Sequence, residues 1–171
     1  HGDFIPHECR SPPDLDRRPR ARAVLSAPQV RDILENDRLR LYAQSIESSA
    51  DSPRQRFEVL LRVEAPGGTV ESPAALLDAA KRDGMLSEVD RWVVERSLGV
   101  LRHWHRSGAI AAPEMSINLT EESIVDPDFA EFLETTITQS GVPANWLSFE
   151  TDHDVAARHG EMLTELFRRL R

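Results

Sequence analysis

The sequence predicts an α/β fold in which strands and helices alternate and the strands form a parallel sheet. Four short segments are rich in apolar and β-branched residues, and stretches with helical periodicity separate most of them. The connections from strand to helix are short, and the sequence has no internal repeat. Together these patterns are typical of βα units on a parallel sheet.

Length, charge and cysteine content narrow the class of protein. The 171 residues are enough for one domain with a hydrophobic core. The net charge of -8 argues against a surface that binds a nucleic-acid polymer, although one or two arginines could hold a small phosphate ligand. Cys9 is the single cysteine and cannot form an internal disulfide. No stretch resembles a signal peptide or reaches the roughly 18–20 apolar residues of a membrane-spanning helix. These features predict a cytoplasmic location, with no membrane segment in this chain.

Residues 1–24 are predicted to be a linker or arm. They combine four prolines with a run of arginines, which disfavours a packed element. The folded domain is therefore expected over residues 25–171. The chain starts at His1 rather than at methionine, so we expect it to be a piece of a longer protein.

The first elements of the domain are a short helix and two strands. Ser26 and Pro28 suit the start of the helix, which leads into a strand at residues 39–46. Residues 56–63 form the clearest strand of the chain. Its apolar run is nearly continuous, which predicts that other elements cover both of its faces.

Two helices are predicted next, over residues 73–82 and 87–106. Pro73 suits the first position of the shorter helix, and Gly84 is placed to end it in a left-handed conformation. The longer helix has a broad apolar face with polar residues opposite, as expected for a helix that packs on a sheet.

Two further strand–helix pairs complete the chain. The strands are predicted at residues 114–119 and 146–151, and the helices at 127–139 and 154–171. Four strands are too few to close an eight-stranded barrel. Open sheet edges are therefore expected unless the rest of the protein or a second copy of the chain covers them.

Each predicted strand carries a polar residue that packing does not require, namely Gln44, Glu58, Asn118 and Glu150. Parallel strands point their carboxyl ends the same way, so these side chains are expected to converge at one mouth of the sheet. An ionised glutamate in an apolar strand is costly unless it is paired or bound to a metal. Two carboxylates and an amide supply only oxygen ligands, which favour Mg²⁺, Mn²⁺ or Ca²⁺ over Zn²⁺.

A purely structural interpretation of the same residues stays open. Glu58 could pair with Arg56 or Arg62, and Asn118 could satisfy backbone groups. If a divalent ion is present instead, the ion and a neighbouring arginine would together form a binding site for a phosphodiester.

Five segments, in order along the chain, resemble the EAL domain family. The sequence EVLLR at residues 58–62 resembles the Glu-x-Leu-x-Arg signature, with Val59 where alanine is usual. The other segments are RLYAQSI (40–46), VESPAALLDAAKRDGMLSEVDRWVV (70–94), SINLT (116–120) and WLSFET (146–151). The resemblance covers about residues 26–171 and implies the N-terminal half of a TIM-like (β/α)8 barrel.

The resemblance also implies an activity. In its complete form the family hydrolyses the bacterial second messenger cyclic di-GMP to linear pGpG, with Mg²⁺ or Mn²⁺ as cofactor. Carried over to this chain, Glu58, Asn118 and Glu150 would be metal ligands, and Arg62 would hold a phosphate of the ligand.

Further ligand and partner roles follow from the same resemblance. Gln44, Leu60 and Asp90 would contact the nucleotide, Leu60 by packing on a guanine. An upstream sensor or GGDEF domain is the protein partner that the resemblance implies, and a homodimer is the alternative.

Besides Val59, the chain departs from the family pattern at Ser45, where proline is usual, and at two further positions. Lys81 replaces a glutamate, and His153 stands where a second glutamate usually follows Glu150. The chain also ends before the segments with the family's paired aspartates, catalytic lysine and later glutamate. The sequence therefore leaves the enzymatic activity open. The complete protein is either a phosphodiesterase or a receptor or interaction domain that keeps the fold without hydrolysis.

Overall fold

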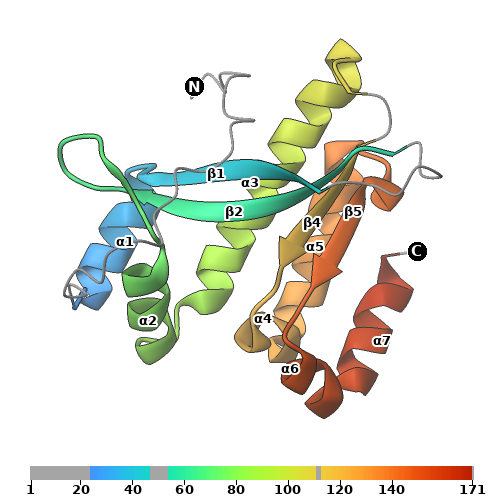
Figure 1. Ribbon diagram of the computed structural model, residues 1–171. Helices are drawn as coiled ribbons and strands as arrows, with labels where there is room; N and C mark the ends of the chain where they lie inside the picture. Colours follow the sequence, from blue (N-terminus) through green and yellow to red (C-terminus); the bar gives the residue numbers. More distant parts are fainter. Residues whose placement is uncertain (1–23, 47–53, 111–112, 171) are drawn as a thin grey trace.

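The computed structural model describes residues 24–46, 54–110 and 113–170, and it confirms a mixed fold of strands and alternating helices (Figure 1). The predicted arm at residues 1–24, with Cys9, lies outside the described residues except for Val24. The helices are α1 (Ala27–Glu35), α2 (Ala74–Arg82), α3 (Leu86–Ser107), α4 (Glu121–Val125), α5 (Pro127–Ser140), α6 (His153–Arg158) and α7 (Gly160–Arg169), and η2 (Ala144–Trp146) is a short 3₁₀ helix. The strands are β1 (Leu39–Ile46), β2 (Arg56–Glu64), β3 (Val70–Glu71), β4 (Glu114–Asn118) and β5 (Leu147–Glu150).

The sheet has the strand order β1-β2-β4-β5, with β3 pairing to β2. β4 is parallel to both β2 and β5, as predicted. β1, however, is antiparallel to β2 along its whole length, so the prediction of parallel strands is wrong for this strand. The physical reason is the length of the connection: nine residues separate Ile46 from Arg56, fewer than the dozen or so that a crossover between parallel strands needs.

The two faces of the sheet differ. Phe57, Val59 and Val63 of β2 are buried, whereas the alternate residues of the strand are only half-buried. The prediction that both faces of β2 are covered is therefore not met by the described residues. Glu58 and Arg62 are an even number of residues apart and so lie on the same face, and charged residues confined to one face are typical of a strand that packs on the other.

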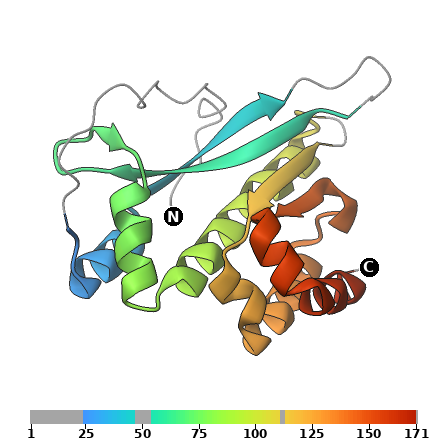
Figure 2. The ribbon, with the colours of Figure 1, turned by 60° about the horizontal axis from the view of Figure 1, so that its bottom comes forward.

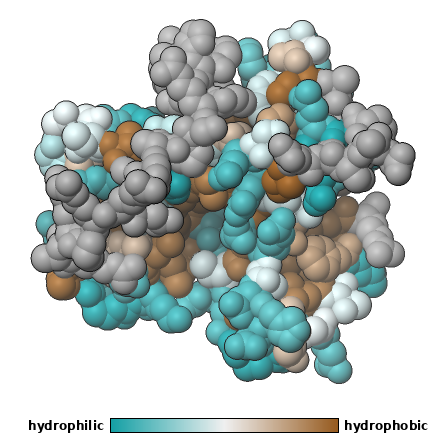
Figure 3. All heavy atoms as spheres, viewed as in Figure 1, coloured by the Kyte–Doolittle hydropathy of each residue, from teal (hydrophilic) through white to brown (hydrophobic). Residues whose placement is uncertain are grey.

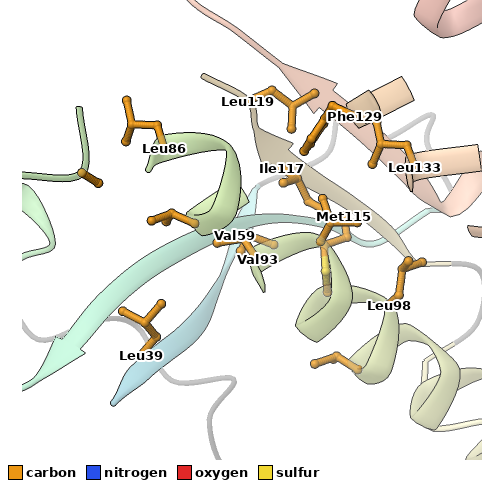
Figure 4. Packing of buried hydrophobic residues seen from close by; sticks show 14 of the residues in the cluster. Leu39, Val59, Leu86, Val93, Leu98, Met115, Ile117, Leu119, Phe129 and Leu133 are labelled. Atoms are coloured by element: carbon orange, nitrogen blue, oxygen red, sulfur yellow. The ribbon is translucent and has the colours of Figure 1, made fainter. Parts of the chain in front are cut away.

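Helix α3 supplies the main cover for the packed face and runs along one side of the sheet (Figures 1 and 2). The ring of Trp104 lies 5.3 Å from that of Phe57, centroid to centroid. Val93 of α3 lies beside Val59, and Met115 and Ile117 of β4 continue the same cluster (Figure 4). Each such buried side chain contributes about 1.5–3 kcal/mol to folding. The core therefore fixes which face of the sheet is left for function.

Helix ends follow the sequence signals closely. α3 begins and ends within one residue of the prediction, and Gly108 ends it with φ 65°. The Asp126 side chain accepts a hydrogen bond from the amide of Asp128 at the start of α5, and Gly141 ends that helix with φ 67°.

The structure differs from the prediction in one helix and contains two additional short elements. The helix predicted over residues 154–171 is two helices, α6 and α7, with His159 between them at φ −120° and ψ 28°. Gly160, a weak helix former, begins the second helix. The five-residue α4 and the two-residue β3 were not predicted, because neither is long enough to show a period.

The surface carries no uniformly hydrophobic face in the view of Figure 3, where hydrophilic side chains interrupt the hydrophobic areas. Among the described residues, no helix combines the length and apolar character needed to cross a membrane.

Candidate functional site

Strand register places the predicted polar residues on one face of the sheet. Gln44 pairs directly with Glu58, Glu58 pairs with Ser116, and Asn118 pairs with Glu150. Directly paired residues point to the same side of a sheet, and so do residues two apart in one strand. All five side chains therefore lie on the face opposite the buried residues Phe57 and Val59 that pack toward α3.

The convergence has a different cause from the one predicted. Gln44 lies near the carboxyl end of β1, but β1 is antiparallel, so this end meets the beginning of β2. Gln44 reaches the site through its direct pairing with Glu58 rather than through a common strand direction.

The candidate metal ligands lie at neighbouring positions of this face. Asn118 and Glu150 are a directly paired couple on strands about 4.8 Å apart. Glu58 is level with Ser116, two residues before Asn118, which corresponds to about 6.6 Å along the strand. Asn118 and Glu150 are exposed and Glu58 is half-buried. Side chains of this length at these spacings can share one cation.

The ion pair that a purely structural role of Glu58 would need is absent from the described part of the chain. Arg56 lies 3.4 Å from a carboxylate oxygen of Glu114, and Arg62 donates to the carbonyl of Leu61. Neither forms an ion pair with Glu58 among the described residues, so the Glu58 carboxylate keeps its ligand capacity.

The donor set fits a hard divalent ion but is small. Glu58, Asn118 and Glu150 provide two carboxylates and one amide oxygen, the ligand types that Mg²⁺ and Mn²⁺ prefer. Within residues 24–46, 54–110 and 113–170, no group of three or more His, Cys, Asp or Glu side chains could hold a metal ion. Further ligands would have to come from water, from the bound phosphate or from parts of the protein outside this chain.

Leu60 and Arg62 continue the same face of β2. Leu60 pairs with Tyr42 and Arg62 pairs with Arg40. Arg40 is neutralised by Glu64, with 2.5 Å between the charged atoms. The Nε of Arg62 is buried and has no hydrogen-bond partner among the described residues. Arg62 thus presents a positive charge with unused donor capacity on the site face.

Asp90 lies below this face, on α3, and is 5% exposed. One oxygen, Oδ2, accepts hydrogen bonds from the amide and hydroxyl of Thr120 and from the hydroxyl of Ser123, at 2.7–2.8 Å. Burial raises the pKa of the Asp90 carboxyl, although these three hydrogen bonds oppose the shift. The contacts fix the segment that follows Asn118, and a contact between Asp90 and a nucleotide stays a prediction.

A surface ion-pair cluster joins the segments that follow β4 and β5. Glu121, at the start of α4, accepts hydrogen bonds from Arg158 at 2.9 and 3.3 Å, and lies 2.7 Å from Nε2 of His159. Both contacts lower the pKa of the Glu121 carboxyl, the one with His159 most. The backbone amide of Leu119 also donates to the carbonyl of Glu150 at 2.8 Å. The ends of the two strands that carry Asn118 and Glu150 are therefore tied together.

Sequence reasoning missed three residues of this face, Tyr42, Ser116 and Ser148. Ser116 is buried between Glu58 and Ser148, with which it pairs. The signal that finds them is the two-residue alternation of side chains along a strand, because residues two apart lie on the same face. Counting back from Gln44 gives Tyr42, and counting back from Asn118 and Glu150 gives the two serines. His153, which departs from the family pattern, points away into solvent and is 97% exposed.

Comparison with known proteins defines the family. The family model for the EAL domain matches residues 27–171. The chain therefore belongs to the EAL domain family, whose structures have a TIM-like barrel fold.

Individual relatives agree with this assignment. The cyclic di-GMP phosphodiesterase PdeB of Shewanella oneidensis is 29% identical over 149 residues, which are 85% of this chain and 17% of PdeB. The EAL domain of FimX from Pseudomonas aeruginosa, solved bound to c-di-GMP, is similar with a TM-score of 0.74 and 26% identity. That similarity covers 82% of this chain and 55% of the FimX chain.

A third similarity concerns the fold alone. The S helix-GGDEF-EAL structure of LapD from Vibrio cholerae has a TM-score of 0.70 at 21% identity, over 87% of this chain and 36% of that one. The chain thus spans about half of an EAL domain of known structure, and much less of the curated relative PdeB.

Proposed function

We propose that this chain is the front part of a cyclic di-GMP phosphodiesterase, and that the complete protein binds cyclic di-GMP on the site face and hydrolyses it to linear pGpG. The observation that supports this most is the gathering of Glu58, Asn118 and Glu150 on one face with Arg62. The match to the family model and the similarity to PdeB and FimX support the same activity.

Glu58, Asn118 and Glu150 would hold a divalent ion, Mg²⁺ or Mn²⁺, through oxygen atoms. Such an ion, when bound, polarises a phosphoryl oxygen and lowers the pKa of an attacking water. The role of the protein side chains is to place these oxygens on a rigid sheet, since β4 and β5 are paired up to Asn118 and Glu150.

Arg62 would bind a phosphate of the ligand through a charge-assisted hydrogen bond. Its buried Nε has no partner within the described residues, and its neighbour Arg40 is already neutralised by Glu64. Gln44, exposed beside Glu58, would contact the nucleotide through its amide, and Leu60 would pack on a guanine.

Asp90 has a more restricted role in this proposal. Its Oδ2 is occupied by Thr120 and Ser123. A contact to a guanine edge would therefore use Oδ1, while Oδ2 keeps the segment after Asn118 in place.

The proposed partners extend beyond the nucleotide. The LapD structure joins a GGDEF domain to an EAL domain, and its fold is similar to that of this chain. An upstream GGDEF or sensor domain, and a homodimer, are proposed for the complete protein. A cytoplasmic site of action is proposed as well, because the ligand is an intracellular second messenger.

Substitution of Glu58 by alanine in the full-length protein tests the proposal. Glu58→Ala should abolish Mg²⁺- or Mn²⁺-dependent hydrolysis of cyclic di-GMP, because one of two carboxylate ligands is lost. The circular dichroism spectrum should stay unchanged, since Glu58 makes no ion pair among the described residues. Glu95→Ala, which removes an exposed carboxylate from α3, is the matched control and should keep full turnover.

Two other results would redirect the proposal. Unchanged turnover in Glu58→Ala would exclude Glu58 as a ligand. Wild-type protein that binds cyclic di-GMP in calorimetry but does not hydrolyse it would identify a receptor, and absence of binding would leave only an interaction domain.

A further inference from the structure

The site face is ordered in rows across β1 and β2. One row holds the polar pair Gln44 and Glu58, and the last holds Arg62 opposite Arg40. Between them lies the pair Tyr42 and Leu60. Rows of one face are two residues apart, which corresponds to about 6.6–6.8 Å along a strand. The face therefore changes from polar, to apolar, to cationic within about three rows.

Tyr42 and Leu60 are suited to act together. Directly opposite residues of an antiparallel pair have Cβ atoms about 4.5–5.5 Å apart, so the ring and the leucine side chain form one continuous apolar area. Both side chains are half-buried. Tyr42 is the single tyrosine of the chain, and within the described residues its hydroxyl makes no hydrogen bond. Its packing on the α3 side is excluded, because its neighbours Leu41 and Ala43 occupy that face.

The residues next to Tyr42 and Leu60 indicate which kind of ligand could bind on them. A flat aromatic group lying there has an amide, that of Gln44, one row away on one side. It has an uncompensated guanidinium, that of Arg62, one row away on the other. A nucleotide matches this order, because it joins a planar base that can be hydrogen-bonded to an anionic phosphate.

We propose that Tyr42 is a further ligand-binding residue, whose ring forms with Leu60 the platform on which one base of a cyclic dinucleotide stacks. The inference rests on the proposed function and adds a residue to it. Stacking on an aromatic ring strengthens binding for any base, so Tyr42 sets affinity, and the hydrogen-bonding groups around it set base identity.

Binding of cyclic di-GMP to the full-length protein, measured by calorimetry in EDTA so that no metal-dependent hydrolysis occurs, tests this role. Loss of base stacking corresponds to about a 5- to 150-fold rise in Kd, and we expect a rise in this range for Tyr42→Ala. Tyr42→Phe keeps the ring and should bind within about threefold of wild type. Tyr42→Leu keeps apolar volume without a ring and should resemble Tyr42→Ala. Phe167→Ala, which removes an exposed aromatic side chain from α7, is the matched control and should not change Kd.

Each outcome decides between defined alternatives. Folded Tyr42→Ala protein with wild-type Kd would overturn the proposal. So would wild-type binding by Tyr42→Leu, because it would show that Tyr42 only fills space. If wild-type protein does not bind cyclic di-GMP, the proposed function itself fails, and this result is distinguishable because it does not depend on any Tyr42 variant.

Discussion

At the scale of the residue, the important feature is a charge that forms no ion pair among the described residues. Arg62 is the clearest case. Its neighbour across the ladder, Arg40, has Glu64, and Arg56 has Glu114. Like charges directly opposite each other destabilise a sheet. An arginine kept in such a position without a carboxylate among the described residues is well explained by an anionic ligand.

Arg62→Ala is predicted to weaken binding of cyclic di-GMP to the full-length protein by about 1.5–3 kcal/mol. This is the contribution of a charge-assisted hydrogen bond to a phosphate. Arg102→Ala, on the exposed side of α3, is the control for loss of a positive charge. Calorimetry of both variants provides the comparison, and an equal effect of the two would remove Arg62 from the site.

At the scale of the element, the segment between β4 and α5 is held from two sides. On one side, Asp90 of α3 accepts hydrogen bonds from Thr120 and Ser123. On the other side, Glu121 contacts Arg158, the last residue of α6, and His159, which follows it. The surface cluster around Glu121 contributes little to stability, because exposed ion pairs are screened by solvent. The buried Asp90 network is the stronger of the two anchors, and it places Asn118.

The stability contribution of Asp90 is predicted to depend on pH in one direction. Because burial raises the pKa of Asp90 in the folded protein above its unfolded value, its contribution is fully present below the unfolded pKa. The contribution is lost as pH rises through the folded pKa. The free energy of unfolding of wild type, relative to Asp90→Asn, should therefore fall as pH rises from about 4.

Urea denaturation of the full-length protein over a pH series measures this difference. Asp154→Asn removes an exposed carboxyl group and serves as control, with a relative stability that changes little over the same range. A wild-type stability that rises with pH relative to Asp90→Asn would contradict the assignment of burial as the dominant influence.

Local signals predicted the long elements well, and non-local pairing explains the differences. Gly108 and Gly141 mark helix ends because a left-handed residue suits glycine. β3 pairs with β2, and Thr120, which precedes α4, donates to Asp90 of the distant helix α3. The division between α6 and α7 was missed because the apolar spacing continues across His159 and Gly160.

In the candidate site, too, the sequence indicates residue types, whereas strand pairing determines which of them lie together. Residue types on the strands indicated Gln44, Glu58, Asn118 and Glu150, but only the register shows that they share a face. The antiparallel direction of β1 could not be read from apolar composition, which is the same for either direction. The sequence does not single out Tyr42, because tyrosine is a common strand residue and only the register shows its neighbours.

At the scale of the whole molecule, the site face is one side of a sheet whose other side is packed. α3 and the cluster around Val59, Val93 and Met115 pack against the other face of β2 and β4, so the site residues are carried by strands that belong to the hydrophobic core. In the TIM-like barrels of the EAL family, the strands enclose this kind of face. The chain spans about half of such a domain, and the remaining strands would supply the further ligands that three side chains leave open.

The position of a Mn²⁺ ion in crystals of the full-length protein with cyclic di-GMP would show whether the three strands share one metal site. Anomalous diffraction locates the ion independently of the ligand. We predict that oxygen atoms of Glu58, Asn118 and Glu150 coordinate one ion, on the face that also carries Arg62. An ion bound elsewhere, or these three side chains directed to different faces, would contradict it.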